Sequence, residues 1–268
     1  MLVLGEAETI ITKTLIRVAL AAYQLIYRSG LLSTSLGQRL FVEAYMLYKQ
    51  TIEARYTNLI LKFIPRGSTV IDVGANIGYF TLQFARQVGA NGQVVAIEPE
   101  PNNFAQLSRI VARAKLPAKI SLYKLAAADA IGQQNLKLDL FHPANHRLSN
   151  TGLPIEVTTI DALVEKLGNP SIAFMKIDVQ GAEHKVLQGA VKTIARSHPV
   201  LFCELDDDAL RNFQSSAIDL ANFVRSLGYT IYALDPKRGY YQIDVDKTQQ
   251  EHPAHWYTDY LFLSHQPR

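Results

Sequence analysis

The chain lacks the features that mark disulfide-stabilised, nucleic-acid-binding and membrane-spanning proteins. Its 268 residues include one cysteine, Cys203, which excludes a disulfide framework and a cysteine-rich zinc site. A lone cysteine inside an apolar strand is typical of a reducing compartment, so we expect a cytoplasmic protein. The formal net charge is only +3 and the Lys and Arg residues are scattered, so we expect no nucleic-acid partner.

Long apolar runs are also missing. A membrane-spanning helix needs about 20 consecutive apolar residues, whereas the apolar N-terminal stretch 10–27 contains Lys13 and Arg17. This stretch carries no clear signal-peptide cleavage site either. It predicts a helix that packs on the protein or on a partner, or one that lies on a membrane surface with Tyr23 and Tyr27 at the interface. The sequence leaves both alternatives open.

The length and composition fit one large α/β domain with an extension. We expect residues 1–66 to form an N-terminal helical extension and residues 67–268 to form the domain. There, strand patterns alternate with helical patterns, which predicts a mostly parallel sheet with helices on both faces. The expected strands cover residues 68–74, 93–98, 119–126, 133–140, 171–178, 199–205, 229–234 and 259–264. The expected helices cover residues 77–88, 101–115, 159–167, 181–197 and 215–227.

The segment 70–82 reads as a strand, a tight turn and a helix. Gly74 lets the backbone bend sharply and approach a ligand, and Gly78 lets the helix pack close to the sheet. In the dinucleotide-binding fingerprint a middle glycine admits the pyrophosphate, but Asn76 stands at that position here. Asp72, just before the turn, would also repel phosphate. The turn therefore argues against NAD or FAD and favours a cationic or zwitterionic ligand.

The next strand ends in Glu98, about 20 residues after the glycines, where a carboxylate can accept hydrogen bonds from both hydroxyls of a ribose. An acid before a glycine turn, followed by a strand that ends in an acid, resembles the S-adenosylmethionine (SAM) site of Rossmann-like methyltransferases. Further motifs follow in order at Glu98–Leu107, Leu125–Gly132, Val157–Leu163, Met175–Ala190 and Pro199–Glu204.

This ordered series resembles the FkbM family of SAM-dependent methyltransferases, many of which are assigned as O-methyltransferases, over roughly residues 67–205. The resemblance implies a Rossmann-like class I methyltransferase fold. Its mostly parallel seven-stranded sheet has an antiparallel last strand, which runs between the two strands before it. Two positions depart from the family pattern. Gln180 stands where the family usually has Glu, and Leu205 and Asp206 stand where a His often follows the Glu204 position, which argues against His-based chemistry there.

The resemblance implies SAM as the cofactor. Asp72 would lie near the amino group of its methionine moiety, Glu98 near the ribose, and Asn76 near either end. Ala126 and Ala127 leave room for the adenine, although core packing explains these two alanines equally well. Asp129 could accept a hydrogen bond from the adenine amine. The expected cofactor-binding residues are therefore Asp72, Gly74, Asn76, Gly78, Glu98, Ala126, Ala127 and Asp129.

Methyl transfer from a sulfonium to oxygen is an in-line displacement, so the protein must align two reactants and handle one proton. Asp178 closes an apolar strand at the carboxyl edge of the expected sheet and is the first candidate to position the acceptor or accept its proton. His184 and Glu204 are the other catalytic candidates. Lys176 could pair with an acid such as Glu204. Glu183 begins a helix, where the helix dipole gives a carboxylate a structural role.

His142 and His146 are separated by Pro143, which argues against a helical metal-binding pair, so we expect no metal. We expect the polar segment 141–152 to be a loop that lines the acceptor pocket. The expected acceptor is a hydroxyl on a small molecule, a sugar or a lipid-linked compound. Alternatives remain: a catalytically inactive SAM-fold scaffold, N- or C-methylation, and, disfavoured by Asn76, an NAD-type oxidoreductase.

Overall fold

The computed structural model describes residues 34, 37, 56–138, 147–235, 239–245, 247 and 257–266. Most of the expected N-terminal extension, including the helix expected at 10–27, lies outside these residues. The end of the extension is helical over residues 56–61. Ile60 and, just beyond the helix, Ile64 are buried against Phe84 and the central sheet. The last part of the extension is thus packed on the domain.

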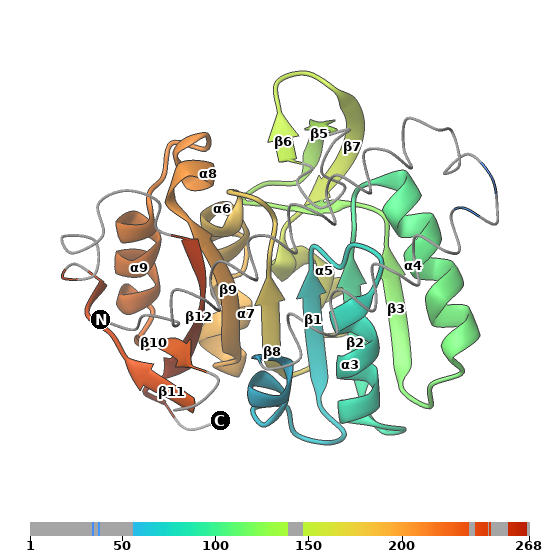
Figure 1. The fold of residues 1–268 in the computed structure, drawn as a ribbon, viewed down its shortest axis with the longest axis horizontal. Helices are drawn as coiled ribbons and strands as arrows, with labels where there is room; N and C mark the ends of the chain where they lie inside the picture. Colours follow the sequence, from blue (N-terminus) through green and yellow to red (C-terminus); the bar gives the residue numbers. More distant parts are fainter. Residues whose placement is uncertain are drawn as a thin grey trace.

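The centre of the molecule is an eight-stranded sheet with the order β11-β10-β12-β9-β8-β1-β2-β3 (Figure 1). β12 runs antiparallel between β9 and β10, and the pairs from β9 to β3 are parallel. The strands are β1 (Thr69–Val73), β2 (Gln93–Ile97), β3 (Lys119–Tyr123), β8 (Ile172–Ile177), β9 (Val200–Asp206), β10 (Tyr229–Asp235), β11 (Gly239–Gln242) and β12 (Tyr257–Ser264).

Without β11, this order is the Rossmann-like arrangement with an antiparallel last strand, so the fold expectation is confirmed. β11 adds an eighth strand, which local patterning did not predict. It pairs with the edge of β10 and leaves Tyr240 and Tyr241 substantially exposed. It therefore lacks the alternation of buried and exposed residues that would predict a strand from the sequence.

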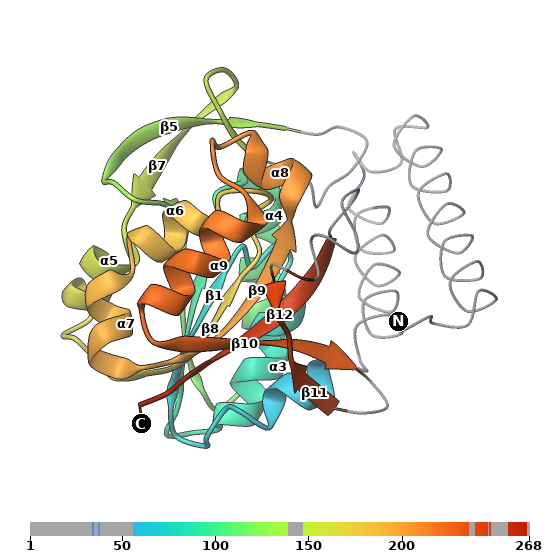
Figure 2. The ribbon, with the colours of Figure 1, turned by 90° about the vertical axis from the view of Figure 1, so that its left-hand side faces the viewer.

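Helices cover both faces of the sheet, because successive residues of a buried strand point to opposite sides. Val70 packs with α3, whereas Ile71 packs with the cluster formed by α5, α7 and α9. Figure 2 shows these layers from the side. The helices are α3 (Tyr79–Val88), α4 (Pro101–Ala114), α5 (Ile160–Lys166), α6 (Glu183–Gln188), α7 (Val191–Ser197), α8 (Asp207–Arg211) and α9 (Ala217–Ser226).

A small second sheet, with the order β4-β7-β5-β6, stands above the carboxyl edge of the main sheet (Figure 1). Its strands are β4 (Ala126–Ala127), β5 (Gly132–Lys137), β6 (Arg147–Ser149) and β7 (Leu153–Thr158). The single strand expected at 119–126 was therefore wrong in its end, because the chain leaves the main sheet after Tyr123 and joins the small one. Leu136, Leu148 and Ile155 bury one face of the small sheet.

The helix expected at 181–197 is two helices, α6 and α7, separated at Gly189 and Ala190. A Cβ added at Gly189 would lie 2.0 Å from the carbonyl oxygen of Ala128. The break therefore lets the backbone pass close to the start of the small sheet, a long-range contact that helical periodicity does not reveal.

Candidate active site

The turn after β1 is held between the ends of β2 and β8. The backbone N–H groups of Gly74 and Ala75 donate to the carbonyl oxygen of Ile97 over 3.0 and 2.9 Å. Gly74 has a φ of 77°, and a Cβ at this position would lie 1.9 Å from the carbonyl oxygen of Asp178. Only glycine therefore allows the turn to touch the end of β8.

Asn76 and Glu98 join this turn to the end of β2. Asn76 has a φ of 50°, a left-handed conformation that Asn tolerates, and its side-chain oxygen accepts a hydrogen bond of 2.7 Å from Ile77 N. Its own N–H donates to Glu98 Oε2 over 2.8 Å, and the N–H of Glu100 donates to Glu98 Oε1 over 3.0 Å. Farther along the turn, Gly78 lies close enough to Leu107 of α4 that an added Cβ would meet it at 2.6 Å.

The Glu98 carboxylate is 5% exposed as a residue, and burial raises its pKa to about 7, against the opposing effect of its two backbone hydrogen bonds. An ionised carboxylate offers roughly four acceptor positions, so acceptor capacity remains after these bonds and the one from the Asn103 side chain are made. Glu98 therefore clamps two loops together and keeps acceptor capacity for a ligand with hydroxyl groups.

Asp72 faces the interior rather than solvent and has no exposed surface. Its Oδ2 accepts a hydrogen bond of 2.6 Å from Thr81 Oγ1, and its Oδ1 lies 3.8 Å from Lys176 Nζ with no hydrogen-bond partner. Burial raises the pKa of Asp72, while the Lys176 ammonium and the Thr81 hydroxyl act in the opposite direction. The expected contact of Asp72 with the cofactor amino group stays a prediction.

Lys176 is buried in β8 and links two acids. Its Nζ lies 3.1 Å from Asp178 Oδ2 and 3.8 Å from Asp72 Oδ1, and it stands 5.1 Å above the centre of the Phe80 ring. These ion pairs replace the partner that the sequence suggested, since Glu204 is bonded by Gln180 instead. The ammonium stabilises the ionised form of Asp178.

Gln180 connects the two catalytic candidates at the ends of β8 and β9. Its Nε2 donates to Asp178 Oδ1 over 3.2 Å and to Glu204 Oε2 over 2.8 Å. Its backbone is left-handed, with a φ of 56°. Asp178 is the more open of the two acids paired with Lys176, since its side chain is 31% exposed and that of Asp72 is fully buried. The structure thus brings Asp178 and Glu204 together through a neutral amide, whose role the sequence signalled only as a departure from the family pattern.

Glu183 contacts the backbone of the loop that precedes α6. Its Oε1 accepts hydrogen bonds from the N–H groups of Val179 and Gly181 over 3.0 and 3.1 Å. It is 1% exposed, and burial raises its pKa to about 7. These contacts give Glu183 the role of holding the loop that carries Gln180.

His184 lies apart from this pair of acids. Its Nδ1 is 2.6 Å from Ser215 Oγ, and its ring centre is 5.1 Å from that of Phe223 in α9. Burial lowers the pKa of His184, so the imidazole is neutral at pH 7. Its described contacts are all with residues outside the Asp178–Gln180–Glu204 cluster.

The remaining cofactor candidates lie at the start of the small sheet. Ala126 and Ala127 are buried in hydrophobic clusters. Asp129 Oδ2 lies 3.3 Å from Lys185 Nζ, with both side chains about one-third exposed. Ala126 and Ala127 thus have a packing role, and Asp129 has a protein partner. Their roles toward adenine stay predictions.

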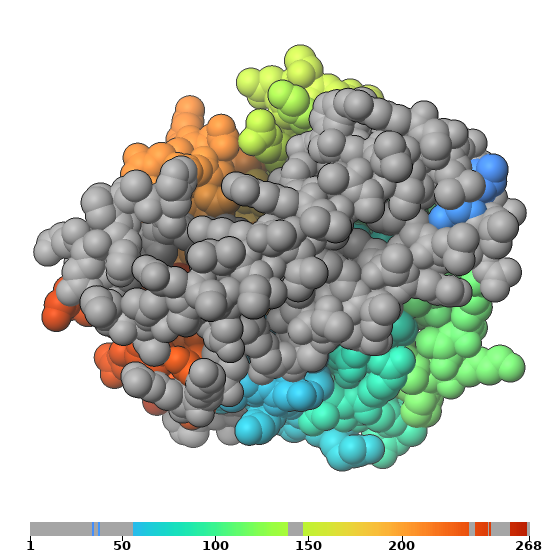
Figure 3. All heavy atoms as spheres, viewed as in Figure 1, coloured from blue at the N-terminus to red at the C-terminus, as the bar shows by residue number. Residues whose placement is uncertain are grey.

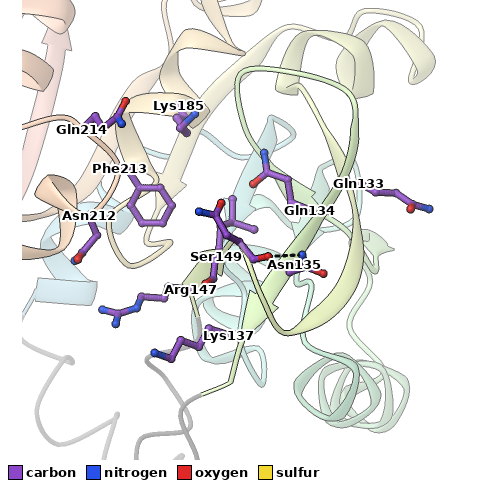
Figure 4. Close-up of a pocket in the computed structure, with 12 residues that line it drawn as sticks. Gln133, Gln134, Asn135, Lys137, Arg147, Ser149, Lys185, Asn212, Phe213 and Gln214 are labelled. Carbon is purple, nitrogen blue, oxygen red and sulfur yellow. Dashed lines mark hydrogen bonds between the residues drawn. The ribbon is translucent and has the colours of Figure 1, made fainter.

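A polar pocket of about 680 Å³ lies between the small sheet and the segment after α8 (Figure 4). In the space-filling view, the yellow-green atoms of the small sheet stand beside the orange atoms around α8 (Figure 3). Residues 147–150 line it, within the expected loop 141–152. The expectation of a loop was wrong at Arg147–Ser149, because these residues pair with β5 and form β6. Phe213 connects the pocket to the site, since a Cβ at Gly181 would lie 3.0 Å from its ring.

Within the described ranges, no group of three or more His, Cys, Asp or Glu side chains could hold a metal ion. His142 and His146 lie outside these ranges, so the expectation of no metal stays a prediction. The helices described in the structure are all too short or too polar to cross a bilayer.

The residues present fit SAM, which carries a sulfonium and an ammonium group. The carboxyl edge of the sheet presents the carboxylates of Asp178 and Glu204 and the remaining acceptor capacity of Glu98, while the turn at Gly74 adds no side chain. One buried carboxylate oxygen, Asp72 Oδ1, has no hydrogen-bond donor. This set of acceptors suits a cation with hydroxyl groups better than it suits a phosphate.

Comparisons with known proteins agree with this chemistry. The sequence profile of the methyltransferase FkbM domain matches residues 72–231, and that of protein-L-isoaspartate(D-aspartate) O-methyltransferase matches residues 11–127. A comparison with curated protein sequences finds no match.

Several solved structures are similar. The FkbM methyltransferase from Methylobacillus flagellatus KT is 20% identical with a TM-score of 0.48, over 73% of this chain and 44% of that one. A SAM-dependent O-methyltransferase from Thermotoga maritima is 11% identical with a TM-score of 0.44, over 81% and 66% of the two chains. A putative O-methyltransferase from Klebsiella pneumoniae is 13% identical with a TM-score of 0.44, over 80% of each chain.

This chain spans less than half the length of the Methylobacillus protein and about two thirds of the Thermotoga protein. The FkbM profile nevertheless matches more than half of this chain, and the ordered motifs of the sequence lie within or next to the matched range. The chain therefore belongs to the FkbM family of SAM-dependent methyltransferases.

Proposed function

We propose that the protein methylates a hydroxyl group of a small-molecule, sugar or lipid-linked acceptor at the carboxyl edge of the main sheet. The observation that carries this proposal is the position of Asp178. Its carboxylate is partly exposed at the end of β8, with one oxygen paired to Lys176 and the other bonded by Gln180. A fixed, ionised carboxylate at this edge can take the one proton that O-methylation releases.

Several residues would hold the cofactor. Glu98 would accept hydrogen bonds from the ribose hydroxyls, and Asp72 and Asn76 would bind the methionine moiety, beside the bare turn at Gly74. When bound, SAM supplies the electrophilic methyl group. The chain's own contribution is to align the acceptor oxygen with that group and to exclude competing orientations.

Proton handling falls to the acids at the ends of β8 and β9. The proton that the acceptor hydroxyl loses on methylation would pass to a carboxylate oxygen of Asp178. Glu204 shares the Gln180 amide and is the second candidate. His184 is less suited, because its Nδ1 is already within hydrogen-bond distance of Ser215 Oγ.

Two measurements test this function. Calorimetry should detect binding of SAM and of S-adenosylhomocysteine but not of NADH. Incubation with SAM carrying a labelled methyl group and a panel of hydroxylated acceptors should yield a labelled methyl ether. Binding of SAM with no transfer to any acceptor would support the scaffold alternative, and label on nitrogen or carbon would exclude O-methylation.

We also propose that the protein is cytoplasmic. The support is its single cysteine, Cys203, whose thiol is free and fully buried in β9, where burial raises its pKa. Contact with a membrane surface through residues 10–27 would bring the site to a lipid-linked acceptor. These residues lie outside the described part of the chain.

A further inference from the structure

Two cations lie side by side on neighbouring strands of the small sheet. Lys137 of β5 and Arg147 of β6 are directly opposite in the antiparallel register, so their side chains lie on the same face. Like charges at directly opposite positions destabilise a strand pair. Neither side chain forms an ion pair with any acid in the described part of the chain. Within the described residues, these two positive charges have no acidic partner.

Both cations line the polar pocket, and so does Lys185 of α6 (Figure 4). Lys185 is paired with Asp129, whereas the described residues that line the pocket include no acid. The pocket therefore attracts anions. A phosphate or another anionic group between Lys137 and Arg147 would relieve their repulsion through charge-assisted hydrogen bonds, the strong class of such bonds.

The rest of the lining suits hydroxyl groups. Six lining residues carry side-chain amides, which donate and accept hydrogen bonds at the same time. They are Gln133, Gln134, Asn135, Asn150, Asn212 and Gln214. Among these, Asn135 Nδ2 donates to Asn150 O over 3.1 Å, and Asn212 Nδ2 to Asp208 O over 3.0 Å. The side-chain oxygens of both residues remain available to accept hydrogen bonds from a polyhydroxylated ligand.

Phe213 places this pocket next to the catalytic edge. Its ring lines the pocket, and a Cβ added at Gly181, in the loop between β8 and α6, would lie 3.0 Å from it. The same loop carries Gln180, which bonds Asp178 and Glu204. A ligand in the pocket would therefore contact Phe213, next to the loop that positions Asp178 and Glu204. Binding energy from such a remote part of a substrate can be used to align its reacting group.

We propose that this pocket binds the acceptor through a phosphorylated sugar portion, with the phosphate at Lys137 and Arg147 and the sugar hydroxyls at the side-chain amides. That this ligand is the methyl acceptor rests on the proposed function. The binding itself does not, because it depends only on the charges and amides of the pocket.

The test is calorimetry of the full chain with hexose 1-phosphates and 6-phosphates, the corresponding free hexoses, and inorganic phosphate. At least one hexose phosphate should bind roughly tenfold or more tightly than its free hexose and than inorganic phosphate, and its affinity should fall as salt is added. Equal affinity for the free hexose, equal affinity for inorganic phosphate, or no hexose phosphate bound would each overturn the proposal.

Variants locate the binding. The double substitution Lys137→Gln with Arg147→Gln should weaken hexose-phosphate binding by at least about tenfold, since each change removes a charge-assisted hydrogen bond. Its melting temperature should not fall, because the cross-strand repulsion is removed. The matched control is Arg113→Gln with Lys119→Gln, two exposed cations outside the pocket lining, which should leave the affinity unchanged. Equal affinities of the two double variants would overturn the site.

Two further arms identify the source of the sugar phosphate and separate this inference from the proposed function. Sedimentation with phosphatidylinositol vesicles of the wild type, but not of the pocket variant, would assign the sugar phosphate to a lipid; hexose-phosphate binding without sedimentation would assign it to a soluble compound. SAM affinity is measured on the same samples. Hexose-phosphate binding without SAM binding would contradict only the proposed function, whereas SAM binding and methyl transfer without hexose-phosphate binding would contradict only the pocket.

Discussion

Gln180 Nε2 lies 2.8 Å from Glu204 Oε2 and donates a hydrogen bond to it across the ends of β8 and β9. The same amide nitrogen donates to Asp178 Oδ1 over 3.2 Å. A neutral amide between two carboxylates can donate one N–H to each of them, which an ionised Glu at this position could not do. The departure from the family's usual Glu thus has a structural consequence at the catalytic edge.

Gln180→Glu should destabilise the protein by about 1–3 kcal/mol at pH 8, because a charged acceptor replaces a donor between two acids. The loss should shrink at pH 5, where the new carboxyl can be protonated and donate again. Urea unfolding at both pH values measures it. Gln188→Glu, an exposed change on α6, is the control and should shift stability by less than about 0.5 kcal/mol. Equal stability of Gln180→Glu and the wild type at pH 8 would show that the hydrogen bonds from Gln180 to Asp178 and Glu204 contribute little to stability.

Asp178→Asn keeps the shape of the side chain and removes its charge. If Asp178 accepts the acceptor's proton, turnover should fall by about 10²- to 10⁴-fold while SAM affinity stays within a few-fold. Stopped assays with labelled SAM give the first quantity and calorimetry the second. Asp244→Asn, at an exposed carboxylate 3.8 Å from Arg225, is the control. Near-normal turnover in a folded Asp178→Asn protein would move the proton to Glu204, His184 or water.

Glu98→Ala should weaken SAM binding by about 1.5–3 kcal/mol, the range for hydrogen bonds to a charged group. Its carboxylate also receives the N–H groups of Asn76 and Glu100, so the turn after β1 should loosen as well. Calorimetry gives the affinity, and circular dichroism checks that the fold survives. Asp129→Ala tests the adenine contact in the same assay. An unchanged SAM affinity in either variant would remove that residue from the cofactor site.

The buried carboxyl group of Glu183 should make the stability of the protein depend on pH. Burial raises its pKa from an ordinary value of 4.5 to about 7, so the native state binds the proton more tightly than the unfolded chain does. Stability should therefore be fully present below about pH 4.5 and decrease as the pH rises through 7, by up to about 3 kcal/mol for this group. Glu98 adds a change of the same sign.

Glu183→Gln isolates this effect. The amide oxygen can still accept the hydrogen bonds from Val179 and Gly181, but it does not titrate. Unfolding free energies of the variant from pH 5 to pH 8 should therefore decline less steeply than those of the wild type. Parallel pH profiles of the two proteins would show that Glu183 is not protonated over this range in the folded state.

Local chemistry was enough to predict the frame of the site. Gly74 and Asn76 adopt the left-handed backbone that a tight turn needs, and the acids at strand ends follow from apolar runs that stop at a charged residue. Because parallel strands bring their carboxyl ends to one edge, strand order then gathered Asp178 and Glu204 there. These are properties of neighbouring residues, so the sequence alone carried them.

Only the tertiary structure decided which side chains pair. Gln180 and Glu204 are 24 positions apart, and the register of β1 and β8 places Lys176 beside Asp72, in addition to its near neighbour Asp178. The small sheet, with Lys137 opposite Arg147, likewise arises from pairing between distant segments. Such contacts depend on register and on the path of the backbone, which no single stretch of sequence encodes. The sequence thus determined the fold class and the edge where chemistry can occur, and long-range packing determined the partners that set the charges there.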